Sequence, residues 1–277
     1  MTRPLQSCLI AFLSASLSVP LVAAEPPLFD AHLHYNAEDA AIYPPQEIVR
    51  LLQANRVEGA FVTSRPPDLA LSLHQQGPDL ILPMLGVYRN ASEKQRWVHD
   101  AELPDRVEQA LASGIWRGVG ELHIFASERH NPVFLRIVEL ATSHGLPLQM
   151  HCDPAVIDAL FEHAPKAKVL WAHAGAYPFP PLLRDYLDRY PGLYVDLSVR
   201  DQRIAPRGEL SPSWEWLLME YSDRFLVGVD TYRTDRWGDY AGVVARIRHW
   251  LTQLPDDVAE AIAYRNAHSL FGLREGN

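Results

Sequence analysis

Short apolar runs rich in β-branched residues alternate along this chain with longer segments of helical periodicity. A short, nearly continuous apolar run is typical of a strand in a parallel sheet, because such a strand is covered on both faces. Eight runs fit this description: Pro27–His34, Glu58–Ser64, Leu80–Gly86, Trp116–Glu121, Pro147–His151, Lys168–His173, Leu193–Leu197 and Phe225–Asp230.

The segments between these runs have the start and stop residues of helices, with proline near several starts and glycine or proline after several ends. The expected helices are Pro45–Asn55, Asp105–Ser113, Pro132–His144, Asp153–His163, Pro181–Tyr190, Ser211–Tyr221, Tyr240–Leu254 and Asp256–Leu270. Strands that alternate with helices predict an α/β fold with a parallel sheet, and eight units predict a closed (β/α)8 TIM barrel. An open doubly wound sheet is the alternative, but its glycine-rich phosphate loop after the first strand is missing.

Composition agrees with one globular domain. The chain has 277 residues, of which 48% are hydrophobic and 21% charged, so it can form a large core. Its net charge of −9 argues against a nucleic-acid partner, which would favour a basic face. The two cysteines are too few for a disulfide scaffold or a zinc site made of thiolates.

Residues 1–24 have the pattern of a secretory signal peptide. Arg3 precedes an apolar stretch that contains several serines, and Val22-Ala23-Ala24 supplies the small residues of a cleavage site. An uncleaved membrane anchor is the alternative, but it needs about 20 apolar residues. The sequence therefore predicts an exported protein, periplasmic or secreted, in which residues 25–277 form a single barrel domain that is not attached to a membrane.

Histidines and carboxylates stand at the ends of the predicted strands. The carboxyl ends of the strands form one face of such a barrel, and active sites lie there. Because residues i and i+2 of a strand point the same way, His32 and His34 can bind one cation together. The other residues at these ends are Glu121, His151, His173 and Asp230. Their mixture of imidazole and carboxylate predicts a site for a divalent metal, with zinc favoured over manganese or iron.

The segments FDAHLH, GVGELH, QMHCD, VLWAHAG, LYVDLS, FLVGVD and RNAHSLFGL resemble the amidohydrolase superfamily, specifically its amidohydrolase-2 branch of metal-dependent hydrolases. The resemblance extends over nearly the whole chain after the signal segment. It implies that His32 and His34 bind the first metal, that His151 is a ligand, and that Asp230 is both a ligand and the proton carrier.

The resemblance leaves the roles of two residues open. It makes His173 a ligand or a group that polarises the substrate. Glu121 stands where members of the superfamily carry a group that bridges two metals, so it either bridges two cations or only orients a histidine or the substrate. One or two divalent ions are therefore expected.

This set of ligands implies hydrolysis by a metal-activated water. A bound divalent cation lowers the pKa of its water from about 15.7 to about 7. An amide, lactone, ester or related bond of a small organic substrate suits this chemistry, and that substrate is the one partner expected. The alternatives are a decarboxylase of the same branch, a metal-dependent hydrolase like a deoxyribonuclease, which the acidic charge disfavours, and a non-catalytic metal-binding protein.

Five further residues near the predicted site have weaker signals. His123 shares a strand face with the strand-4 glutamate and can line the pocket. Asp30 can support the site as a hydrogen-bond acceptor, and Asp196 either reaches the site or braces the barrel rim. Cys152 should point away from the metal, since strand side chains alternate. Arg233 is the first choice for gripping a carboxylate or phosphate of the substrate, with a surface arginine as the alternative.

The signal peptide predicts a defined N-terminus for the exported protein. N-terminal sequencing of protein from the exported fraction should begin at Glu25, because cleavage is expected after Ala24. A retained Met1 in that fraction would contradict this prediction.

Overall fold

Eight parallel strands, paired in sequence order, form a nearly closed barrel in the computed structural model, which describes residues 26–273. The strands are β1 (Leu28–His34), β2 (Val57–Thr63), β3 (Ile81–Leu85), β4 (Gly118–Ile124), β5 (Leu148–Cys152), β6 (Val169–Trp171), β7 (Leu193–Asp196) and β8 (Phe225–Leu226). Backbone hydrogen bonds from Ala31 to Val227 (2.9 Å) and from Asp230 to His32 (2.7 Å) join β1 to the segment after β8. The predicted (β/α)8 barrel is confirmed.

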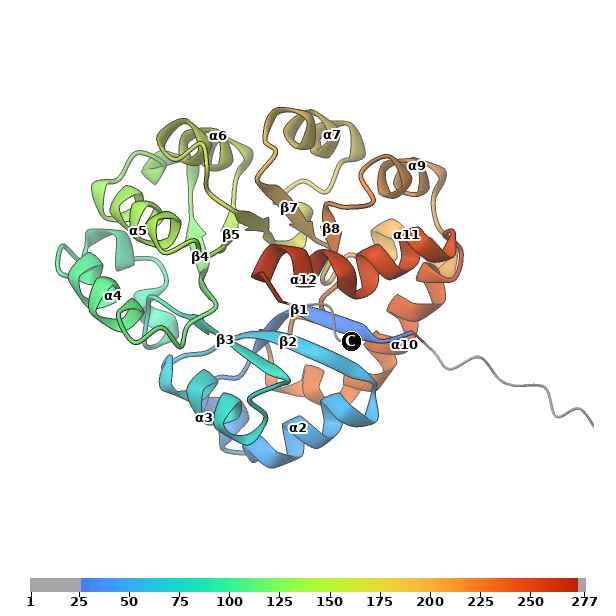
Figure 1. Cartoon of the computed structure of the whole chain (residues 1–277), viewed down its shortest axis with the longest axis horizontal. Coiled ribbons are helices and arrows are strands. Elements are labelled where there is room, and N and C mark those ends of the chain that lie inside the picture. Colours follow the sequence, from blue (N-terminus) through green and yellow to red (C-terminus); the bar gives the residue numbers. More distant parts are fainter. Residues whose placement is uncertain (1–25, 274–277) are drawn as a thin grey trace, which may run out of the picture.

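Helices surround the strands as an outer ring, except for α12, which lies across one end of the barrel (Figure 1). They are α1 (Ala37–Ala40), α2 (Pro45–Ala54), α3 (Asp68–Gln76), α4 (Leu103–Leu111), α5 (Pro132–Ser143), α6 (Pro154–His163), α7 (Pro180–Arg189), α8 (Asp201–Ile204), α9 (Pro212–Glu220), α10 (Tyr240–Leu251), α11 (Asp256–Glu260) and α12 (Asn266–Phe271). The expected helices did not include α3. It buries only Ala70 and Leu73, so its apolar stripe is too narrow to stand out in the sequence.

The carboxyl-terminal part of the chain differs from the prediction. The helix expected over Asp256–Leu270 is divided, because a π-helical turn at Ala261–Arg265 joins α11 to α12. The predicted signal peptide lies outside the described residues. Within residues 26–273, no helix combines the length and the apolar character needed to cross a membrane.

Two strands end earlier than the sequence indicated. β6 stops at Trp171 and β8 at Leu226, so His173 and Asp230 stand in turns beyond the strands. Both have positive φ, 59° for His173 and 55° for Asp230, a region that residues other than glycine seldom occupy. These turns bring the two side chains toward the barrel mouth, where they meet residues of β1 and β4.

Apolar side chains fill the barrel below its polar end. Phe29 of β1 and Phe61 of β2 pack against α12, and the ring of Phe271 lies 5.4 Å from Phe29 and 4.2 Å from Phe61. Figure 1 shows α12 lying across the strands. Asn266 of the same helix donates to the backbone oxygen of Phe225 at the start of β8, so α12 closes the amino end of the barrel. His32, His34 and His173, all buried, lie at the opposite, carboxyl end of the barrel.

Glycine makes room for these interior rings. A Cβ atom at Gly59 would lie 2.3 Å from Cε2 of Phe29, and one at Gly118 would lie 2.3 Å from Cζ of Phe61. Neither ring can withdraw easily, since both are fully buried in a packed interior.

Gly59→Ala should lower the free energy of unfolding by about 1–3 kcal/mol, because an added methyl overpacks the interior. Urea unfolding of the purified protein measures the loss. Gly238→Ala is the matched control, since a Cβ there has no atom within 4 Å. Equal stability of the two variants would contradict this account of the packing.

Candidate metal centre

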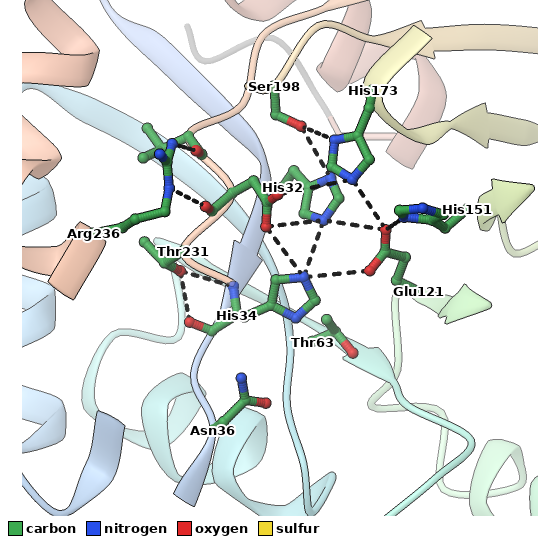
Figure 2. A network of polar contacts seen from close by, with 12 residues as sticks. His32, His34, Asn36, Thr63, Glu121, His151, His173, Ser198, Thr231 and Arg236 are labelled. Atoms are coloured by element: carbon green, nitrogen blue, oxygen red, sulfur yellow. Dashed lines mark hydrogen bonds and ion pairs between the residues drawn. The ribbon is translucent and has the colours of Figure 1, made fainter. Parts of the chain in front are cut away.

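Side chains from five parts of the barrel meet at its carboxyl end. The predicted site residues come from β1 (His32 and His34), β4 (Glu121), β5 (His151), and the turns after β6 (His173) and β8 (Asp230). Figure 2 shows the four labelled imidazole rings gathered around Glu121. All are buried except His151, whose side chain is 48% exposed. The structure thus brings all six residues to one place.

The spacing of four of these side chains fits one cation. The Nε2 atoms of His32 and His34 lie 3.2 Å apart, and Oδ1 of Asp230 lies 3.6 and 3.3 Å from them. The carboxylate oxygens of Glu121 lie 3.8 Å from His32 and 3.4 Å from His34. Donors around a tetrahedral zinc ion, with bonds of about 2.0–2.2 Å, are roughly 3.4 Å apart.

Asp196 determines which nitrogen of His32 faces this group. Its Oδ2 lies 2.6 Å from Nδ1 of His32, so Nδ1 carries the proton and donates it to the carboxylate. The lone pair of Nε2 then faces the carboxylate oxygens of Asp230 and Glu121, an arrangement that needs positive charge between the atoms. Such a second partner, holding the remote nitrogen of the ring, is usual for a histidine that binds metal.

Oδ1 of Asp230 is the atom that most clearly lacks a partner. It is buried and accepts no hydrogen bond, although it lies close to two imidazole nitrogens. A buried carboxylate oxygen without a partner is costly, so it indicates a missing positive group. The residues present therefore fit a divalent cation.

The pKa values of the group reflect its crowded carboxylates. Burial alone would lower the pKa of His32, but Asp230, Asp196 and Glu121 together raise it to about 10. Burial would raise the pKa of Glu121, but His123 and the other surrounding histidines hold it well below its usual range. These carboxylates thus favour a positive charge at Nε2 of His32, either a proton or a bound cation that replaces it.

His173 is held by Ser198, which lies two residues after the end of β7. Ser198 donates to Oδ2 of Asp196 (2.8 Å), so its oxygen accepts from Nδ1 of His173 at 2.9 Å. Nε2 of His173 then faces Oε1 of Glu121 at 3.4 Å and Oδ2 of Asp230 at 3.8 Å. The ring also stacks on His32, with 4.8 Å between centroids. His173 is therefore fixed at the edge of the group.

The structure shows the positions of the residues whose signals in the sequence are weak. Asp196 reaches the site. Asp30 accepts hydrogen bonds from the backbone of His32 and Val229 and from the hydroxyl of Tyr240, so it supports the backbone and no imidazole. Cys152 is buried on the opposite side of its strand from His151, as alternation predicts.

The arginines differ from the sequence-based choice. Arg233 is exposed and pairs with Asp235 at 2.7 Å. It is therefore a surface arginine, which is the alternative to a substrate-binding role. Arg236 instead holds the turn after β8, because it donates to the backbone oxygens of Asp230 and Val229 (2.7 Å each). Arg65 lines a small cavity together with His34, Tyr88 and Glu121. Neither Arg65 nor Arg236 follows a spacing pattern in the sequence, so only the fold could reveal them.

Comparison with known families gives a match over residues 99–273 to the family model described as Amidohydrolase. This range starts after β3, so the case for the His32–His34 pair rests on the geometry described above. A comparison with curated proteins found no match.

Solved structures with the same fold include several amidohydrolases. An amidohydrolase from Burkholderia multivorans with bound zinc has a TM-score of 0.59 at 14% identity, covering 90% of this chain and 100% of that chain. A probable 2-pyrone-4,6-dicarboxylic acid hydrolase from Acinetobacter baumannii, with citric acid bound, has a TM-score of 0.59 at 15% identity, covering 88% and 99%. Amidohydrolase 2 from Bifidobacterium longum subsp. infantis has a TM-score of 0.56 at 14% identity, covering 90% and 100%. At these identities, the similarity shows a shared fold.

Asp196→Asn should weaken binding of a divalent cation about 10–100-fold, because a neutral amide no longer holds His32 in the tautomer that faces the group. Calorimetric titration of the metal-free protein with zinc measures the affinity. Asp158→Asn is the matched control, since Asp158 accepts hydrogen bonds from Tyr186 and Arg189 at the surface. Equal zinc affinity in the two variants would contradict this role of Asp196.

Proposed function

The chain belongs to the amidohydrolase family, and from this premise we propose that it is a metal-dependent hydrolase acting on an amide, lactone or ester bond of a small organic substrate. The observation that supports this most is the buried, unpartnered Oδ1 of Asp230 among imidazole nitrogens. In the proposal, His32, His34, Asp230 and Glu121 hold the cation, with zinc as the favoured metal.

The cation would supply Lewis acidity and a water of lowered pKa. Asp230 is the carboxylate best placed to take the proton of that water. Asp196 is occupied by His32 and Ser198, and Glu121 lies 2.9 Å from Nδ1 of His151, whereas Asp230 would hold the cation through Oδ1 and take the proton on Oδ2. Asp230 would then return the proton to the leaving group, as a general base and acid.

His173 is proposed to face the substrate oxygen. Ser198 and Asp196 hold its ring so that Nε2 lies 3.8 Å from Oδ2 of Asp230. Because Nδ1 already donates to Ser198, Nε2 can donate to a carbonyl oxygen, as negative charge develops there, when the ring is in its imidazolium form. The side chain of His173 is only 9% exposed, so water competes weakly for that hydrogen bond.

The loops beyond the strands favour a substrate with an apolar part and a negative charge. Phe125 and Tyr177, which follow β4 and β6, are each 68% exposed, and Tyr232 after β8 is 47% exposed. Arg65, beside Glu121, can pair with a carboxylate. One similar structure is named for a 2-pyrone dicarboxylic acid, which is a lactone with carboxylates, so such lactones are the first substrates to test. We also propose that the enzyme is exported and acts there.

Asp230→Asn should lower kcat by at least about a hundredfold on the best substrate of a lactone, ester and amide panel, because an amide cannot accept the proton. Zinc content should fall less than activity, since one oxygen ligand remains. Stopped assays on zinc-loaded protein, with elemental analysis of the same samples, measure both.

Asp235→Asn is the matched control for this change, because Asp235 is exposed and pairs with Arg233. Its kcat should equal that of the wild type. An Asp230→Asn enzyme with wild-type kcat and intact zinc would exclude Asp230 as the proton carrier.

A further inference from the structure

A second group of donors lies beside the first, on the outer side of Glu121. His123 is two residues after Glu121 on β4, and its Nε2 lies 3.4 Å from Oε2 of that carboxylate. Nδ1 of His151 lies 2.9 Å from Oε1. A ligand atom from each of the three side chains lies within 4.8 Å of the others. The family resemblance gives His123 no role, so this group is a property of the chain itself.

Tyr88 determines which nitrogen of His123 is available. The Tyr88 hydroxyl lies 2.6 Å from the backbone oxygen of Glu121 and 2.6 Å from Nδ1 of His123. A carbonyl oxygen can only accept, so the single hydroxyl proton is donated to Glu121. Nδ1 of His123 must then carry a proton and donate it to the Tyr88 oxygen. The lone pair is therefore on Nε2, which points at the Glu121 carboxylate.

The family resemblance already implies that Glu121 can bridge two cations, and we propose that His123, in place of His173, completes the second of these sites together with Glu121 and His151. The two sites share the Glu121 carboxylate, with Oε2 near His34 and His123 and Oε1 near His151. This proposal rests on the proposed function, because the shared carboxylate belongs to both sites. It assigns to His123 the ligand position that the family resemblance offers to His173.

The second site is more open than the first. The side chains of His123 and His151 are 15% and 48% exposed, whereas those of His32 and His34 are 0% and 7% exposed. Apart from the shared Glu121, its ligands are imidazoles, while the first site adds Asp230. The second cation should therefore bind after the first and more weakly.

Tyr88 is a positioning residue in this arrangement. Its hydroxyl is buried, and in Tyr88→Phe the proton on Nδ1 of His123 loses its acceptor. The ring could then turn or change its tautomer. Loss of such a supporting hydrogen bond typically weakens metal binding about 10–100-fold.

The test is a titration of the metal-free enzyme with cobalt(II), followed by calorimetry, visible absorption and elemental analysis after desalting. Wild type should bind two equivalents. His123→Gln should bind one, and Tyr88→Phe should bind the second about 10–100-fold more weakly. His130→Gln, which removes an exposed histidine of the following loop, should behave as the wild type. Circular dichroism melts of every variant confirm that the fold is intact, and Tyr88→Phe tests the site without removing a ligand.

The outcomes separate this proposal from the proposed function. Two equivalents of unchanged affinity in His123→Gln would overturn the second site. A wild type that binds only one equivalent would also overturn it, while leaving the first site and the hydrolase intact. A wild type that binds no cobalt, or a His32→Ala/His34→Ala double variant that keeps the first equivalent, would overturn the proposed function itself.

Discussion

The hydrogen bond between Nδ1 of His32 and Oδ2 of Asp196, 2.6 Å long and fully buried, is the interaction on which the centre depends. It connects β1 to β7 across the barrel mouth and directs the Nε2 lone pair of His32 toward Asp230 and Glu121. Through Ser198, the same carboxylate also holds His173. One fully buried aspartate thus orients two imidazoles of the centre.

The two ends of the barrel have different roles: one is packed with apolar side chains, and the other collects buried charged groups. Its amino end is closed by α12 and the interior phenylalanines, and this apolar packing stabilises the fold. Its carboxyl end collects Glu121, Asp196 and Asp230, three buried carboxylates that would repel one another without imidazoles and a positive charge. A cation is therefore expected to stabilise the folded protein as well as to take part in the reaction.

Sequence patterns predicted the barrel. They also predicted that the six site residues lie at the same end of it, because each residue stands at or just beyond the end of an apolar run. They did not predict the turns that contain His173 and Asp230, since positive φ at a residue other than glycine leaves no trace in hydrophobic periodicity. They left open whether Asp196 reaches the site or braces the barrel rim, and they gave Tyr88 no contact with a histidine. Asp196 contacts His32, and Tyr88 contacts His123. Both contacts join segments far apart in the chain, and such contacts cannot be read from the pattern of a single sequence.

The central claim is that the carboxyl end of the barrel is a metal centre, and a crystal structure of zinc-loaded protein tests it directly. Diffraction data recorded on both sides of the zinc absorption edge locate the metal without assumptions about its ligands. The account predicts an anomalous peak bounded by Nε2 of His32, Nε2 of His34 and Oδ1 of Asp230, at bonds of about 2.0–2.2 Å. A crystal with no anomalous peak at that position, in which water or a protonated imidazole contacts Oδ1 of Asp230, would contradict it.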